Sequence, residues 1–149
     1  MATSQAIIVD YQAGNVESVQ RACHAVGIDA LISADPNLIR KAERLIFPGV
    51  GTAESAVNTL HETGIWDALL DFANAGRPLL GICLGAQILL EQTEEGDQTC
   101  LGLVPGQFRQ FMFQDAALKV PQIGWNAVHF NTDHPLLHGI CLLYTSPSP

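Results

Sequence analysis

The chain has 149 residues, of which 48% are hydrophobic and only 15% are charged, and its formal net charge at pH 7 is −8. A nucleic-acid-binding protein needs a basic face, and among the seven Lys and Arg residues only Arg40, Lys41 and Arg44 cluster, so nucleic acid is excluded as a partner. The hydrophobic content supports one domain with a sizeable core, and the low charge is typical of an α/β fold around a buried parallel sheet.

Neither the amino terminus nor any apolar stretch predicts a targeting signal or a membrane anchor. The first residues, MATSQAIIVDYQ, lack a basic n-region, and the longest apolar stretch, residues 78–90, is far short of the ~20 residues that a membrane helix needs. The four cysteines show no CxxC spacing, which is typical of reduced thiols in a cytoplasmic protein. We expect no membrane contact, no metal site and no cofactor.

The first ninety residues alternate between short apolar runs and helical patterns. The apolar runs predict buried strands at residues 6–9, 29–32, 45–47 and 78–82. The helical patterns cover residues 14–26, a short stretch opened by Asp35-Pro36, and residues 53–63, 65–75 and 84–91. Four strand-then-helix units predict an α/β fold, a doubly wound and mostly parallel sheet with flanking helices on both faces.

The pattern changes beyond residue 100. Residues 103–113 and 120–130 predict an antiparallel addition to the fold, so that one domain extends from residue 1 to residue 140. Residues 141–149, CLLYTSPSP, follow no periodicity that continues this domain, and they resemble one reading frame of a common transposase sequencing adaptor. We expect a non-native tail after a fragment of a longer gene; the alternative is a genuine disordered terminus.

The strongest chemical signal is GICLG at residues 81–85, placed between a predicted strand and a predicted helix. This spacing is that of a nucleophile elbow with Cys83 at its centre, and the glycines permit the close packing that a sharp strand-to-helix turn requires. The turn displays the thiol at a helix amino terminus, where partial positive charge favours the thiolate, and it directs the backbone N–H of Leu84 toward a developing oxyanion. A buried structural cysteine between two packing glycines is the alternative interpretation.

A second glycine-rich turn, FPGVG at residues 47–51, follows the third predicted strand. Gly49 and Gly51 flank Val50, so the peptide unit between them can approach a ligand closely or turn over. An ordinary strand-to-helix turn would carry the same glycines.

Together, GICLGAQ and FPGVG resemble the triad glutamine amidotransferase family. Further segments resemble the glutaminase subunits of imidazole glycerol phosphate synthases. These segments are Asp10-Tyr11 with Gly14-Asn15, Glu94-Glu95, GLVPG at 102–106 and KVPQIGWN at 119–126, followed by HPL at 134–136 with Gly139-Ile140. The resemblance extends from about Ile7 to Ile140, and Gln122 stands where the family usually has histidine.

The resemblance implies that Cys83 attacks the side-chain amide of glutamine, forms a glutamyl thioester and releases ammonia, after which water releases glutamate. It implies an oxyanion site formed by the backbone at Leu84 and at Gly49, Val50 and Gly51. It further implies glutamine contacts at Gln87 and Glu95, although a solvent-facing glutamine and a surface carboxylate are simpler interpretations of these two positions.

The same resemblance implies a partner. Asn15, Trp125 and Asn126 match the surface that faces the synthase's cyclase subunit, a (β/α)₈ barrel that receives the ammonia. The joint reaction makes imidazole glycerol phosphate and AICAR in histidine biosynthesis. From its residue type alone, Trp125 would be assigned to a core.

The family's base and orienting carboxylate lie in a Phe-His-Pro-Glu motif, and this sequence has none. His134-Pro135 is followed by Leu136 instead of glutamate, and the other four histidines do not match the position either. A cysteine without its base is poorly activated, so we expect this fragment to be inactive alone.

Two other functions fit part of the sequence. A dienelactone-hydrolase-like α/β hydrolase also sets a cysteine on an elbow, but it does not account for FPGVG or for residues 119–126. A non-catalytic binding or regulatory domain could keep the amidotransferase fold without a complete triad.

Overall fold

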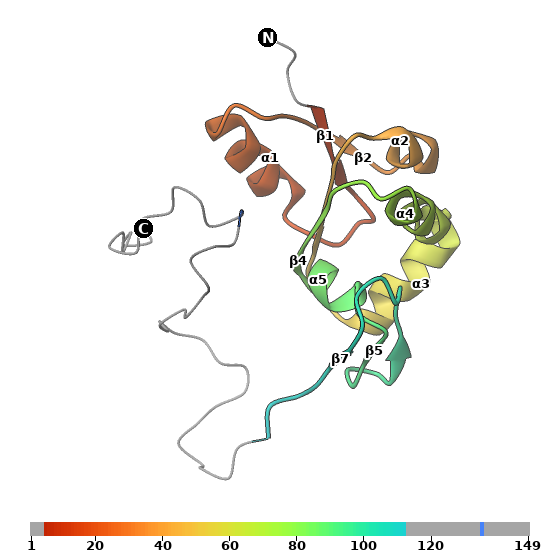
Figure 1. The fold of residues 1–149 in the computed structure, drawn as a ribbon. Helices are drawn as coiled ribbons and strands as arrows, with labels where there is room; N and C mark the ends of the chain where they lie inside the picture. Colours follow the sequence, from red (N-terminus) through yellow and green to blue (C-terminus); the bar gives the residue numbers. More distant parts are fainter. Residues whose placement is uncertain (1–4, 113–134, 136–149) are drawn as a thin grey trace, which may run out of the picture. The chain divides into compact units, whose positions relative to one another are not determined.

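The computed structural model describes residues 5–112 and residue 135 (Figure 1). The chain divides into two compact units, Met1–Phe111 and Met112–Pro149. In the second unit only Met112 and Pro135 are described, and both are exposed. The strand expected at residues 120–130, the interface residues Trp125 and Asn126, and the tail at 141–149 lie outside the described residues.

A four-stranded parallel sheet forms the centre of the first unit. Its strands, in the spatial order β2-β1-β3-β4, are β1 (Gln5–Val9), β2 (Asp29–Ser33), β3 (Leu45–Gly49) and β4 (Leu79–Cys83). All four predicted strands are confirmed, and β3 and β4 extend further at their carboxyl ends than the apolar runs indicate. Because strands β3 and β4 are in parallel register, Gly49 lies opposite Cys83.

The helices follow the predicted order. They are α1 (Val16–Ala25), α2 (Pro36–Lys41), α3 (Ala53–Thr63), α4 (Ile65–Asn74) and α5 (Leu84–Ile88). The expected helix at residues 84–91 is shorter than predicted, because the backbone of Glu91 bonds to Gly106 instead of continuing the helix. Hydrogen bonds to residues outside the helix therefore replace its last turn.

The sheet is covered on both faces, as the sequence predicts (Figure 1). Successive residues of a strand point to opposite faces. Ile7 and Val9 accordingly join a large core with α2, α3, α4 and α5, whereas Ala6 and Ile8 join a smaller core with α1. Burial of this alternating pattern fixes the register of β1, since a one-residue slip would exchange the two faces.

A small second sheet follows α5 and contains part of the expected strand at residues 103–113, whose expected partner at 120–130 lies outside the described residues. Its strands, in the order β6-β5-β7, are β5 (Gln92–Thr93), β6 (Gln98–Thr99) and β7 (Gln107–Phe108). Two of them precede residue 100, and the pairing of β5 with β7 is parallel. The polar run at residues 91–99 has no apolar alternation, so no pattern there predicts β5 or β6.

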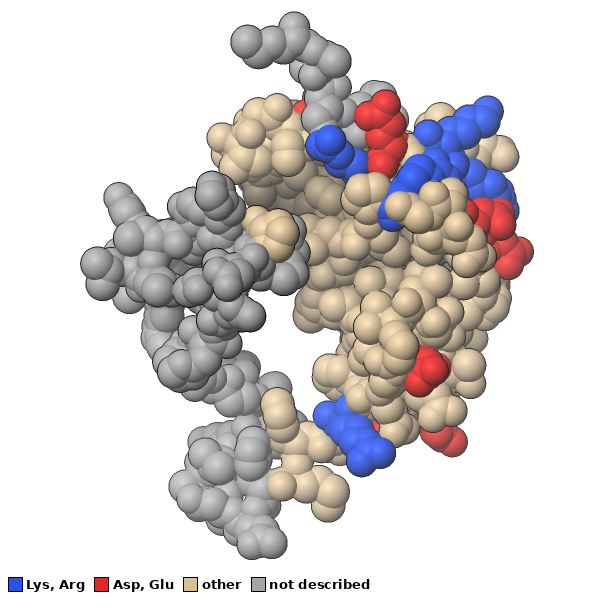
Figure 2. Space-filling view, viewed as in Figure 1, with Lys and Arg blue, Asp and Glu red and all other residues tan. Residues whose placement is uncertain are grey.

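Charged side chains are sparse on the face shown in Figure 2, and the positive ones gather mainly near α2, whose last turn contains Arg40 and Lys41. In the described part of the chain, no helix is both long enough and apolar enough to cross a membrane.

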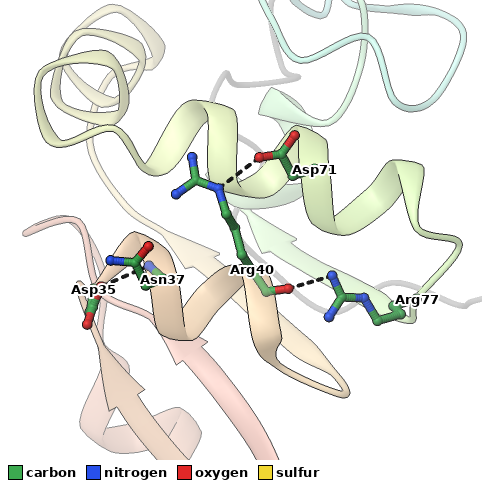
Figure 3. A network of polar contacts seen from close by, with 5 residues as sticks. All are labelled: Asp35, Asn37, Arg40, Asp71 and Arg77. Atoms are coloured by element: carbon green, nitrogen blue, oxygen red, sulfur yellow. Dashed lines mark hydrogen bonds and ion pairs between the residues drawn. The ribbon is translucent and has the colours of Figure 1, made fainter.

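Helix α2 is defined at its amino end by the predicted cap. The carboxylate of Asp35 accepts a hydrogen bond from the N–H of Asn37 at 2.8 Å, and Pro36 occupies the first helical position (Figure 3). The carboxylate accepts a first-turn N–H group that has no acceptor inside the helix, and the proline has no N–H group that needs one.

The carboxyl end of α2 is held by Arg77, which precedes β4. Its guanidinium donates to the carbonyl oxygen of Arg40 at 2.6 Å (Figure 3). It also donates to the carbonyl oxygen of Ala42 at 2.6 Å, and its Cζ lies 4.3 Å from the ring centroid of Phe72. Arg40 in turn forms an ion pair with Asp71 of α4 at 2.8 Å. A cation at a helix carboxyl end satisfies carbonyl groups that have no donor partner inside the helix.

We expect Arg77→Ala to lower the free energy of unfolding by about 2 kcal/mol, because two charge-assisted hydrogen bonds and a stacked cation are lost together. Urea denaturation followed by circular dichroism measures this change. Arg21→Ala is the matched control, since Arg21 is 74% exposed and lies 3.9 Å from Glu17; it should change stability by no more than about 0.5 kcal/mol. Equal losses in both variants would contradict the role given to Arg77.

Candidate functional site

Three loops meet at the carboxyl edge of the parallel sheet. They follow β1 at Asp10 and Tyr11, β3 at Val50 and Gly51, and β4 at Cys83. Open parallel sheets hold their sites at this edge. Gly14 of the first loop lies close to the end of β3, since a Cβ built on it would be 3.7 Å from Pro48 and 3.8 Å from the Cα of Gly49. Because Gly49 is also the register neighbour of Cys83, the sequence-predicted nucleophile and the glycine-rich turn at the end of β3 are neighbours.

Cys83 occupies the strained turn that the motif predicts. Its backbone has φ 57° and ψ −119°, and it is both the last residue of β4 and the cap of α5. A positive φ combined with this ψ lies outside the regions that a residue with a Cβ ordinarily adopts, and it persists only where the surroundings impose it. The thiol is exposed, so the interpretation of Cys83 as a buried structural cysteine is wrong.

The glycines on either side of Cys83 are required by packing. A Cβ on Gly85 would overlap the carbonyl oxygen of Phe47 in β3, and a Cβ on Gly81 would lie 2.7 Å from the Cα of Ala86. The missing side chain of Gly85 therefore allows α5 to lie directly against β3, and that of Gly81 allows α5 to lie directly against β4.

Gly49 is the third position without room for a side chain. A Cβ there would collide with the hydroxyl of Tyr11 and would lie 3.0 Å from the N of Gly85. Tyr11 is 1% exposed, and its ring packs against Phe47 with centroids 5.3 Å apart. In the sequence, Tyr11 was identified only as part of the family resemblance, and its position beside Gly49 was not predicted.

The loop after Gly49 is open and has unusual backbone geometry. Val50 is 55% exposed, and Gly51 has φ +104°, where an added Cβ would meet no atom within 4 Å. Leu84, on the other side of Cys83, is the first residue of α5, so its N–H has no acceptor inside the helix. Of the two residues expected to hold an oxyanion, Leu84 directly follows Cys83 in the chain, and Val50 directly follows Gly49, the register neighbour of Cys83.

Gln87 and Glu95 are joined by a hydrogen-bond network. The Nε2 of Gln87 donates to the Oε2 of Glu95 at 3.0 Å and to the Oγ1 of Thr93 at 2.7 Å. Thr93 also accepts from the backbone N–H of Glu95 at 3.1 Å. Gln87 is buried, so the interpretation as a solvent-facing residue is wrong, whereas Glu95 is exposed.

Thr93 is a residue that sequence reasoning missed. It is 1% exposed and fixes both members of the network, but it lies in a polar stretch where nothing distinguishes it from its neighbours. A threonine between polar residues would be identified only by the contacts it makes.

Asn15 has a local structural role. Its side chain caps α1 by accepting a hydrogen bond from the N–H of Ser18 at 3.2 Å, and the residue is exposed. An exposed cap is compatible with the expected interface, and the cap by itself explains the choice of residue type.

The two described histidines lie at the opposite edge of the sheet from Cys83. His24 and His61 are in the last turns of α1 and α3, helices of 10 and 11 residues that start at the edge where Cys83 lies. At 1.5 Å per residue these turns are about 10 Å or more from that edge. His61 stacks on Trp66 at 4.2 Å, so it serves packing, as expected.

The family follows from a comparison of the sequence with known domains. Residues 8–109 match the CobB/CobQ-like glutamine amidotransferase domain. The chain belongs to this glutamine amidotransferase family. The match covers the FPGVG turn, the elbow at Cys83 and the network around Gln87.

Within curated proteins, the amidotransferase chain is similar to subunits named imidazole glycerol phosphate synthase subunit HisH. The protein from Nitratidesulfovibrio vulgaris is 46% identical over 138 residues, covering 89% of this chain and 65% of the relative. The protein from Gloeobacter violaceus is 39% identical over 135 residues, covering 90% of this chain and 59% of the relative. The predicted resemblance is confirmed, and the chain spans less than two thirds of the length of these relatives.

Two solved structures share the fold of this amidotransferase chain. A crystal structure of a glutamine amidotransferase aligns with a TM-score of 0.62 at 23% identity, covering 74% of this chain and 59% of the other. A putative peptidase E from Listeria monocytogenes aligns with a TM-score of 0.56 at 18% identity, covering 68% and 63%. Both confirm the predicted α/β architecture.

We expect Gly85→Ala to destabilise the amidotransferase fold by about 3 kcal/mol or more, because the added methyl group overlaps the β3 backbone and α5 must move away. Gly27→Ala is the control: it has open space but φ +77°, so only the backbone strain of about 1 kcal/mol is expected. Urea denaturation of both variants checks the difference. A Gly85→Ala protein as stable as Gly27→Ala would show that α5 does not need this close approach.

Exposure also predicts which thiol reacts. We expect iodoacetamide to alkylate Cys83 at least about tenfold faster than Cys23 or Cys100, because those two are buried and burial raises the pKa of the Cys100 thiol. Mass spectrometry of proteolytic peptides at several reaction times gives the three rates. Faster labelling of Cys100 than of Cys83 would contradict the described geometry.

Proposed function

We propose that the whole protein is the glutaminase subunit of an imidazole glycerol phosphate synthase, which hydrolyses glutamine to glutamate and ammonia. The observation that carries the proposal is the exposed thiol of Cys83 on a strained backbone with φ 57° and ψ −119°, with Gly49 of the neighbouring glycine-rich turn directly opposite. The similarity to synthase subunits supports the choice of subfamily.

In this mechanism the Cys83 sulfur forms a bond to the side-chain amide carbon of glutamine, and the carbon–nitrogen bond breaks after the nitrogen receives a proton. Ammonia leaves, and a glutamyl thioester remains on Cys83. Water then attacks the thioester carbon and the carbon–sulfur bond breaks; the water oxygen remains in the carboxyl group of glutamate, and one proton of the water goes to the Cys83 sulfur. Two steps of moderate difficulty replace one difficult amide hydrolysis.

The negative charge that develops on the amide oxygen is held by backbone N–H groups. That of Leu84 is one of them, a role supported by its position as the first residue of α5, where it has no helical acceptor. That of Val50 reaches the same oxygen after the Gly49–Val50 peptide turns, a change supported by the open surroundings and positive φ of Gly51. Gln87 and Glu95 contact the substrate, and Thr93 holds both in position.

The ammonia passes to a cyclase subunit, a (β/α)₈ barrel, which makes imidazole glycerol phosphate and AICAR in histidine biosynthesis. Asn15, Trp125 and Asn126 form part of the surface that faces this partner. The words "synthase subunit" in the relatives' names support an assembly of this kind. The described cysteines are free thiols, which supports a cytoplasmic location.

The 149 residues by themselves are inactive in this proposal. The sequence has no Phe-His-Pro-Glu segment to supply the base and its orienting carboxylate, and both described histidines are remote from Cys83. Without its base, a triad nucleophile can lose up to ~10⁶ in turnover. The protein encoded by the intact gene is therefore the appropriate material for activity measurements.

We expect the protein encoded by the intact gene, mixed with its cyclase partner, to hydrolyse glutamine. The Cys83→Ala substitution should reduce the rate of this hydrolysis at least ~10⁴-fold, because no thioester can form. Glutamate release measured by a coupled assay checks this. Cys23→Ala is the control and should leave the rate unchanged, since Cys23 belongs to α1 and is buried in the smaller core with Ala6, Ile8 and Ala30.

Two results would overturn the proposal in different ways. Full glutaminase activity in Cys83→Ala would remove Cys83 as the nucleophile. No glutamine hydrolysis by the intact pair would favour the non-catalytic domain that keeps this fold.

A further inference from the structure

The hydroxyl of Tyr11 is a buried polar group without a hydrogen-bond partner among the described residues. The residue is 1% exposed, so water does not replace the missing partner. Leaving a buried hydroxyl unpaired costs about 1–3 kcal/mol, and such exceptions in a folded protein call for an explanation. A phenylalanine would fill the same space against Phe47 without this cost.

The position of this hydroxyl points to the active cysteine. It lies where a Cβ of Gly49 would be, and Gly49 is the register neighbour of Cys83 on the adjacent strand. Adjacent strands are about 4.8 Å apart, so the hydroxyl lies within about one strand spacing of the elbow. The charge of Cys83 also acts on Tyr11, as shown by its contribution to the raised pKa of the phenol.

A thiolate at Cys83 has few other sources of stabilisation in the described part of the chain. Helix α5 has only five residues, so its dipole is weak. Most charged side chains on the elements around this edge of the sheet would oppose a negative sulfur; they are Asp10, Glu17, Glu54, Glu94, Glu95 and Asp97.

The described cations on the same elements are engaged elsewhere. Arg21 lies 3.9 Å from Glu17, and Arg109 lies 3.9 Å from Glu94. A neutral hydrogen-bond donor is therefore the group available to favour the thiolate.

We propose that Tyr11 positions the nucleophile by donating a hydrogen bond from its buried hydroxyl to the Cys83 thiolate. The inference rests on the proposed function, since it assigns a role within the same cysteine site. The bond forms when the thiol ionises and its exposed sulfur rotates toward Gly49. Gly49 is required because any side chain there would occupy the place of the hydroxyl.

The phenol remains a donor throughout the pH range in which a thiol ionises. Burial, and after it the charge of Cys83, raises the pKa of Tyr11 from 10.0 to about 12. The O–H is thus intact when the thiolate appears, and a hydrogen bond to an ionised acceptor is stronger than one to a neutral group.

The pH dependence of Cys83 alkylation tests this role on the 149-residue chain, without requiring turnover. We expect Tyr11→Phe to move the midpoint of the rate-versus-pH profile of Cys83 upward by about one pH unit, the size of one charge-assisted hydrogen bond. At pH 7 the rate should fall about threefold, because a less acidic thiol forms less thiolate but a more nucleophilic one. The profile of Cys100 in the same digests is the internal control and should not move.

A second variant keeps the test decisive if Tyr11→Phe does not fold, as judged by circular dichroism. In a Tyr144→Phe background Tyr11 is the remaining tyrosine, and replacing it with 3-fluorotyrosine makes the phenol a stronger donor. The midpoint should then move downward. The proposal would be overturned if the midpoint did not change in the folded phenylalanine variant. It would also be overturned if the midpoint stayed the same or moved upward with fluorotyrosine.

The same variants in the intact protein separate this inference from the proposed function. If a glutamine analogue labels Cys83 but Tyr11→Phe does not change the alkylation profile, the role of Tyr11 is rejected and the glutaminase mechanism is kept. A shifted profile, with analogue labelling at another cysteine, would leave Tyr11 acting on the thiol and overturn the glutaminase mechanism.

Discussion

The site depends on the close approach of α5 to the end of β3. The carbonyl of Phe47 occupies the space in which residue 85 would carry a Cβ, and the same contact brings Gly49 against the first turn of α5. Cys83 joins β4 to α5 beside this contact with a positive φ of 57°, and its side chain is exposed. The strand-to-helix connection that exposes the Cys83 thiol thus depends on three positions without a side chain, which are Gly49, Gly81 and Gly85.

Much of the scaffold could be predicted because its signals are local. The apolar runs and the cap at Asp35-Pro36 placed the strands and α2, and GICLG placed the elbow, since each pattern reports its own backbone conformation. The small sheet at residues 92–108 could not be predicted, because two-residue strands carry no periodicity. The length of α5 was also wrong, since Glu91 is held by a distant carbonyl of Gly106.

The contacts within the site were harder to derive than its location. The family resemblance named Gln87 and Glu95, but their mutual hydrogen bond and its dependence on Thr93 are tertiary facts. Tyr11 likewise follows β1 in sequence, and only the fold brings its hydroxyl beside Gly49 of β3. Parallel strands predict which loops share an edge, whereas the pairing of individual atoms across those loops depends on rotamers that sequence patterns do not encode.

The network at Gln87 also has a fixed polarity. An ionised Glu95 can only accept hydrogen bonds, so the amide of Gln87 must turn its nitrogen toward it, and the second proton on that nitrogen is committed to Thr93. The amide is left with its oxygen as the group that it can present to any other molecule. Gln87 therefore discriminates by electronic character as well as by shape: a neighbouring ammonium or amide nitrogen is attracted, and a carboxylate is repelled.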